Sequence, residues 1–94
     1  MRIRWTRRAA RDLDGIEAYI EVDDRQAAVR AVLRIMDAVE HLADHPYLGR
    51  SGRVADTREL VVPSTPYIVA YRLTADALEI LRVLHCAMRW PDHF

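Results

Sequence analysis

The sequence predicts an α+β domain in which an N-terminal strand and an α-helical hairpin precede a three-stranded antiparallel sheet. Two observations indicate this order. Apolar residues recur at helical spacing in the first half of the chain, and strand-like segments separated by turn signals fill the second half. The chain has 94 residues, of which 51% are hydrophobic and 30% charged, and this is typical of one ordered globular domain. We therefore expect a single domain over residues 1–94.

The chain opens with a short alternating segment that leads into a helix. Arg2-Ile3-Arg4-Trp5 alternates polar and apolar residues, as a half-buried strand does. Thr6 is suited to cap the helix that we expect from about Arg7 to Val22. The apolar positions of this helix lie on one stripe, with Tyr19 beside it. They are Ala9, Leu13, Ile16 and Ile20.

A second helix is expected from about Arg25 to Asp44, with Asp24 as its N-cap. Its apolar positions again follow spacings of four and three residues. They are Ala28, Val32, Ile35, Val39 and Leu42. Because the connection between the two helices is so short, we expect them to form an antiparallel hairpin.

Residues 45–53 are expected to form a loop, because they contain one proline and two of the three glycines. Three strands should follow, from Arg58 to Pro63, from Tyr67 to Leu73 and from Leu78 to His85. Short connections predict antiparallel neighbours. Both faces of the last strand are largely apolar, so it should lie centrally in the sheet, and Arg82 within it needs a partner.

The charge balance argues against several classes of function. The 14 basic residues, all of them arginine, equal the 14 acidic residues, whereas proteins that grip nucleic acid backbones usually carry a basic excess. We therefore expect no direct sequence-specific nucleic acid binding. No apolar run approaches the ~18 residues of a membrane span, and no secretory segment follows the start, so we expect a cytoplasmic protein without membrane contact. Cys86 is the single cysteine, which excludes an internal disulfide.

The charges are nevertheless unevenly distributed along the first helix. Residues 1–11 contain five arginines and no acid, and residues 12–24 contain six acids and no base. This is the unfavourable sense for the helix macrodipole, which local pairs such as Arg8 with Asp12 are expected to offset. The segment is interpreted as a solvated face or as a patch that matches the opposite charges of a partner.

Several segments carry a resemblance to a known family. In the first half they are residues 9–16 and the run His45-Pro46-Tyr47-Leu48-Gly49-Arg50, and in the second half they are 57–63, 66–72 and 80–85 with the following Arg89-Trp90. Their order and spacing resemble the RelE/ParE superfamily, and its ParE branch in particular, over essentially the whole chain. The resemblance implies a toxin of a type II toxin–antitoxin system with this α+β fold, and a ParD-like antitoxin whose C-terminal region folds over it.

The superfamily implies two activities, ribosome-dependent mRNA cleavage in the RelE branch and poisoning of DNA gyrase in the ParE branch. Cleavage requires a general base, a general acid and positive charge at the phosphate. Ile68 stands where the RelE branch commonly has an arginine, and no tyrosine follows the last strand. We therefore expect a gyrase inhibitor that acts by binding and is not an enzyme. A nuclease, the alternative, would use the residues His85, Arg72, Arg82 and Arg89.

The expected contacts with partners lie at two places. For the gyrase target we expect the end of the last strand and the C-terminus, with His85, Arg89 and Trp90, although Trp90 is as readily explained as the seal of a small core. For the antitoxin we expect the groove between the first helix and the sheet. The residues predicted there are Ile16, Glu17, Tyr19, Ile20, Arg58 and Arg72.

Two further expectations concern what the protein lacks. His41, His45 and His93 have no spacing that would join His85 in a metal site, so we expect no metal and no cofactor. A second alternative function is that of a non-toxic corepressor, which would only help its partner bind operator DNA.

Overall fold

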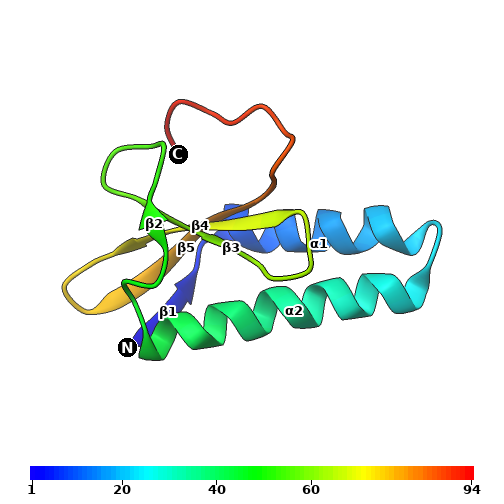
Figure 1. The fold of residues 1–94 in the computed structure, drawn as a ribbon, viewed down its shortest axis with the longest axis horizontal. Coiled ribbons are helices and arrows are strands. Elements are labelled where there is room, and N and C mark those ends of the chain that lie inside the picture. The colour runs from blue at the N-terminus through cyan, green and yellow to red at the C-terminus, as the bar shows by residue number, and fades with distance from the viewer.

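Two helices pack against a five-stranded mixed sheet in the computed structural model, which describes all residues, 1–94 (Figure 1). The elements in chain order are β1 (Arg2–Trp5), α1 (Arg7–Glu21), α2 (Arg25–Asp44), β2 (Arg50–Ser51), β3 (Arg58–Val61), β4 (Tyr67–Leu73) and β5 (Ala77–His85). The α+β class, the opening strand and the helical hairpin are confirmed. No helix of the chain is long and apolar enough to cross a membrane.

The sheet has the strand order β1-β5-β4-β3-β2. The three predicted strands form its antiparallel centre, and the expected central place of β5 is confirmed. The sheet is larger than predicted, because β1 adds to β5 in parallel and β2 adds to β3. β2 lies inside the predicted loop 45–53, and its two residues are too few to show a strand period.

Both predicted helix caps are confirmed. The Thr6 hydroxyl accepts a hydrogen bond from the backbone N–H of Ala9 at 3.2 Å, and Asp24 accepts one from the N–H of Ala27 at 3.0 Å. The Thr6 hydroxyl also donates to the carbonyl oxygen of Ile80 at 2.8 Å. This bond ties the start of α1 to β5, where β1 ends.

The core lies between the helices and the inner face of the sheet. The predicted helical stripes face it, and its fully buried members include Ile35, Leu42, Tyr71 and Ile80. The Tyr71 hydroxyl donates to the carbonyl oxygen of Pro46 at 2.8 Å and accepts from the N–H of Gly49 at 2.9 Å. Burial raises the pKa of this phenol, against the opposing effects of the Gly49 hydrogen bond and Arg58. Tyr71 therefore fastens the loop that follows α2 to the sheet.

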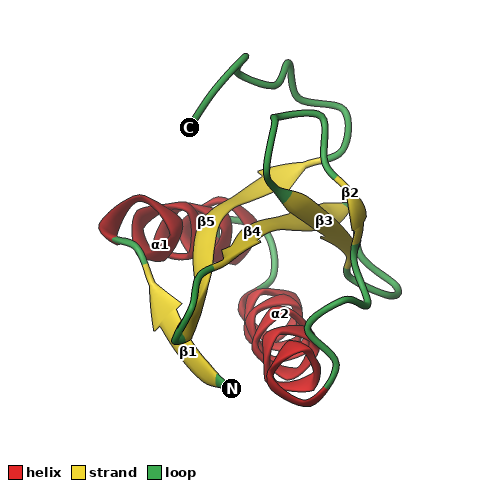
Figure 2. Cartoon of the chain, turned by 90° about the vertical axis from the view of Figure 1, so that its left-hand side faces the viewer, coloured by secondary structure: helices red, strands yellow, loops and turns green.

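The outer face of the sheet, on the side away from the helices, carries two buried carboxylates. Glu79 pairs with Arg4 and Arg72 from the two neighbouring strands, and Glu59 pairs with Arg50 and Arg53. The C-terminal segment, residues 86–94, passes on this side (Figures 1 and 2). Its Trp90 ring lies 4.0 Å from the Arg53 guanidinium carbon, measured to the ring centroid. Trp90 is not a member of the hydrophobic core cluster, and this contact holds the C-terminal segment against the loop that carries Arg53.

Candidate functional site

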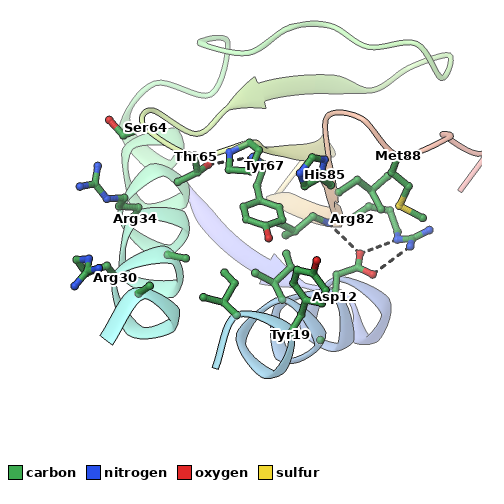
Figure 3. Close-up of a pocket in the computed structure, with 18 of the residues that line it drawn as sticks. Asp12, Tyr19, Arg30, Arg34, Ser64, Thr65, Tyr67, Arg82, His85 and Met88 are labelled. Carbon is green, nitrogen blue, oxygen red and sulfur yellow. Dashed lines mark hydrogen bonds and ion pairs between the residues drawn. The ribbon is translucent and has the colours of Figure 1, made fainter. Parts of the chain in front are cut away.

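A groove with a volume of about 810 Å³ opens between α1, α2, the β3–β4 turn and the end of β5 (Figure 3). Its apolar lining includes Ile16 and Ile20 of α1, Ala27 and Ala31 of α2, and Val83 of β5. A few of the positions that line the groove are small, among them Gly15, Ala27 and Ala31. At Gly15, for example, an added Cβ would meet no atom within 4 Å.

The groove is rich in arginine. Four of the residues that line it are Arg11, Arg30, Arg34 and Arg82, and the only acidic one is Asp12. Arg82 is largely buried and binds Asp12 with two hydrogen bonds, from Nε at 2.7 Å and from Nη2 at 3.1 Å. The backbone N–H of Val83 donates to the same carboxylate at 3.0 Å.

This arrangement answers two sequence predictions. The partner that Arg82 was expected to need is Asp12, so that prediction is confirmed. The expected local pair of Arg8 with Asp12 is wrong, because the buried guanidinium of Arg82 takes the carboxylate. The other three arginines of the groove have no carboxylate within 4.0 Å, so the groove carries uncompensated positive charge.

Two tyrosines and a histidine lie at the β5 end of the groove. The rings of Tyr67 and His85 meet edge to face, with centroids 5.6 Å apart. His85 Nδ1 accepts a hydrogen bond from the N–H of Ala87 at 3.0 Å. Burial, and then the nearby Tyr19 hydroxyl, raise the pKa of Tyr67, so its phenol stays protonated at neutral pH.

The structure brings together part of the predicted antitoxin site. Ile16, Tyr19 and Ile20 all line the groove, and the Tyr19 side chain is exposed. Glu17 belongs to the same helix, but it does not line the groove.

Arg58 and Arg72 were expected beside the first helix, and this placement is wrong. The Arg58 guanidinium stacks on Tyr47 at 4.8 Å and donates to the carbonyl oxygen of Gly49 at 2.8 Å, at the far end of α2. Arg72 points to the outer face, where it binds Glu79 at 2.8 Å. Strand alternation places successive side chains on opposite faces, so two arginines on adjacent strands need not share a site.

The residues predicted for target contact are also divided. His85 lies in the groove, whereas Trp90 stacks on Arg53 beyond the outer face, with Arg89 in the same segment. No group of three histidine, cysteine or carboxylate side chains comes close enough to hold a metal ion.

Sequence reasoning missed Arg11, Arg30, Arg34 and Tyr67 as groove residues. A signal for two of them was present, since Arg30 and Arg34 are four residues apart and therefore share one face of a helix. Tyr67 could not be found from spacing along the chain. It meets His85 only because β4 and β5 pair in that register.

Comparisons with known proteins show which proteins this chain is similar to. A family model described as the ParE toxin of the type II toxin–antitoxin system parDE matches residues 3–90. Y4kP of Sinorhizobium fredii, a toxin by name, is 56% identical over 91 residues, 97% of this chain and 94% of Y4kP. Toxin RelE2 of Caulobacter vibrioides is 40% identical over 83 residues, 88% of this chain and 92% of RelE2. A solved chain of the chromosomal ParDE TA system from P. aeruginosa has a TM-score of 0.80 at 31% identity, covering 90% of this chain and 95% of that chain.

Proposed function

Because the chain belongs to the ParE/RelE family of type II toxin–antitoxin toxins, we propose that it inhibits DNA gyrase by binding and that a ParD-like antitoxin neutralises it. The match to a ParE family model and the similarity to a chain of a ParDE system favour gyrase over the ribosome as the target. Binding without chemistry requires only a rigid surface of the right shape and charge.

The observation that carries this proposal is the separation of the candidate nuclease residues. Arg82 is held by Asp12, and Arg72 is held by Glu79 on the opposite face of the sheet from the groove. Neither guanidinium is free to stabilise the negative charge that develops on the phosphate in the transition state of cleavage. The Nδ1 atom of His85 already accepts a hydrogen bond from the backbone. Of the residues predicted for a nuclease, Arg72 and Arg82 are therefore engaged with carboxylates, and this supports binding over cleavage.

The groove is the proposed antitoxin site. It is bounded by two helices and a sheet, and it combines an apolar floor with positive charge. An amphipathic segment laid into such a groove would bury its apolar face. It would also add stability to a domain of this size, which buries roughly 60–65% of its unfolded surface.

Expression of the toxin without its antitoxin tests the target. Gyrase inhibition predicts growth arrest with DNA damage signalling, and purified toxin should block supercoiling by purified gyrase. Rapid translation arrest with cut message would instead identify a ribosome-dependent nuclease. Normal growth, together with unimpaired gyrase, would identify the non-toxic corepressor.

The contact between His85 and Tyr67 favours the nuclease as the second candidate. A phenol that stays protonated beside an imidazole is a pair that could donate and accept a proton. Tyr67→Phe and His85→Gln separate the two candidates. Both changes should abolish mRNA cleavage if the protein is a nuclease, whereas Tyr67→Phe should leave gyrase inhibition unchanged.

A further inference from the structure

We infer that Arg30 and Arg34 of α2 form a clamp for carboxylates, and that this clamp selects an acidic, amphipathic segment of the antitoxin. The inference rests on the proposed neutralisation by an antitoxin in the groove, and it specifies the chemistry of the segment that binds there. The charge contact that the sequence assigned to Arg58 and Arg72, which lie outside the groove, is thereby assigned to α2.

Arg30 and Arg34 are two like charges on one helical face. Residues four apart in a helix have Cβ atoms about 5–6 Å apart, and like charges at this spacing destabilise the helix. Both side chains are exposed, and neither has a carboxylate within 4.0 Å. The isolated chain thus keeps an unfavourable pair that a bound carboxylate would compensate.

The position of the pair relates it to the groove. Arg30 and Arg34 lie on the α2 side, across from Tyr19 and Asp12 on the α1 side (Figure 3). Asp12 cannot serve as their partner, because Arg82 and the N–H of Val83 already occupy its oxygens. Asp12, the one acid that lines the groove, is therefore not available to the two arginines. The carboxylate for the clamp has to come from the segment that binds in the groove.

The lining specifies the rest of the occupant. A segment that fits must place apolar side chains against Ile16, Ile20 and Ala31 and direct carboxylates at the α2 rim. In a helical segment, acidic residues three or four positions apart would match the spacing of the two arginines. Arginine is suited to this role because its planar guanidinium binds carboxylates in a bidentate manner.

A protein segment fits these features better than a nucleic acid does. A phosphate backbone could meet the arginines, but it would leave the aliphatic floor without an apolar partner. Because Arg30 and Arg34 repel cations and gain little from neutral residues, they would also discriminate against segments that lack carboxylates at this position.

The test measures the affinity of the purified toxin for the ParD-like antitoxin encoded beside it. The double change Arg30→Glu with Arg34→Glu should weaken binding by about tenfold or more, because it turns attraction into repulsion. Arg7→Glu with Arg25→Glu is the matched control, since it makes the same change of charge at exposed helical positions that do not line the groove. Arg30→Gln with Arg34→Gln should give an intermediate loss.

A charge swap on the antitoxin tests the pairing directly. An antitoxin variant with arginine at the acids that match the clamp should restore binding to the Glu variant and not to the Gln variant.

Four outcomes separate this inference from the proposed function. A further variant, Ala31→Trp, blocks the groove by filling it. If the Glu variant binds with wild-type affinity and Ala31→Trp does not bind, the clamp is overturned and the groove remains the antitoxin site. If the Glu variant and Ala31→Trp both bind the antitoxin with wild-type affinity, the clamp and the groove are overturned together. Equal losses for the Glu variant and its control would overturn the clamp as well, because the effect would then be one of overall charge. Binding of an RNA or DNA oligonucleotide that depends on Arg30 and Arg34, with unchanged antitoxin affinity, would assign the arginines to nucleic acid instead.

Discussion

At the scale of single residues, the ion pair between Asp12 and Arg82 joins α1 to β5. The two side chains are only 16% and 11% exposed, and 70 residues of sequence separate them. A buried charge that loses its partner is strongly destabilising, whereas an exposed pair contributes little. Loss of one partner would therefore destabilise the fold mainly because the other charge would stay buried and unpaired.

Asp12→Ala should lower the free energy of unfolding by about 3 kcal/mol, because Arg82 and the N–H of Val83 would lose their acceptor. Urea denaturation of the purified chain measures this loss. Asp14→Ala is the control, since Asp14 is exposed on the same helix and forms no ion pair, and it should change stability by less than about 0.5 kcal/mol. Similar losses in both variants would show that Arg82 finds another partner or water.

Tyr71 predicts how stability depends on alkaline pH. Burial raises its folded-state pKa above the ordinary value of 10.0, so the unfolded chain releases the phenol proton first. The stability that this proton contributes is complete below pH 10.0 and is lost as the pH rises through the folded-state pKa. Denaturant titrations at a series of pH values should show the free energy of unfolding constant near neutrality and falling above about pH 10.

Tyr71→Phe provides the comparison, and Tyr67 contributes in the same direction because its pKa is also raised. The variant should be less stable at neutral pH by about 1–3 kcal/mol, because it leaves the buried N–H of Gly49 without its acceptor. Its decline above pH 10 should be shallower than that of the wild type. A decline of the same slope would mean that other groups cause it.

At the scale of elements, helix α1 carries its charges in the unfavourable order. Its first turn has no acid and its last turn has no base, while Arg7 and Arg8 stand at its positive end. The Thr6 cap and the packing of α1 against β5 hold the helix in spite of this. Tertiary packing generally outweighs such local terms.

Arg7→Glu should therefore stabilise the chain by about 0.5 kcal/mol, since it places a negative charge in the first turn of α1. Arg7 is exposed and forms no ion pair or side-chain hydrogen bond that the change would break. Thermal unfolding at low and high salt checks both the sign and the origin. The gain should shrink as salt is added, and Arg7→Gln should show about half of it.

At the scale of the whole molecule, a net charge of zero conceals an uneven distribution. The groove holds four arginines and one acid, whereas the chain as a whole holds 14 of each sign. At physiological ionic strength charges act over about 8 Å, which is much less than the shortest extent of the molecule, 23 Å. A partner at the groove therefore encounters the groove's charge and not the average.

Association with the antitoxin should for this reason slow as salt is added. We expect the association rate constant to fall by about tenfold or more between low and high ionic strength, with a smaller change in the dissociation rate. Stopped-flow or surface-based kinetics over a salt series would measure this. A rate that does not respond to salt would indicate that apolar contacts alone guide the encounter.

Much of the fold could be predicted because it follows from local rules. The Thr6 and Asp24 caps, the limits of α2 and the span of β4 depend on neighbouring residues or on one period of apolar positions. The extra strand β2 could not be predicted, because two residues show no period and pair only where β3 presents its edge. The parallel place of β1 beside β5 likewise depends on where the helical hairpin returns the chain.

The candidate site shows the same division most clearly. The sequence alone determined the main elements, the apolar faces of the two helices and the likeness to a toxin family. Only the tertiary structure decided which charges share a groove, since it placed Arg30, Arg34 and Tyr67 there and sent Arg58 and Arg72 elsewhere. Periodicity tells which way a side chain points from its own element, but the rotation and register of packed elements determine what it meets.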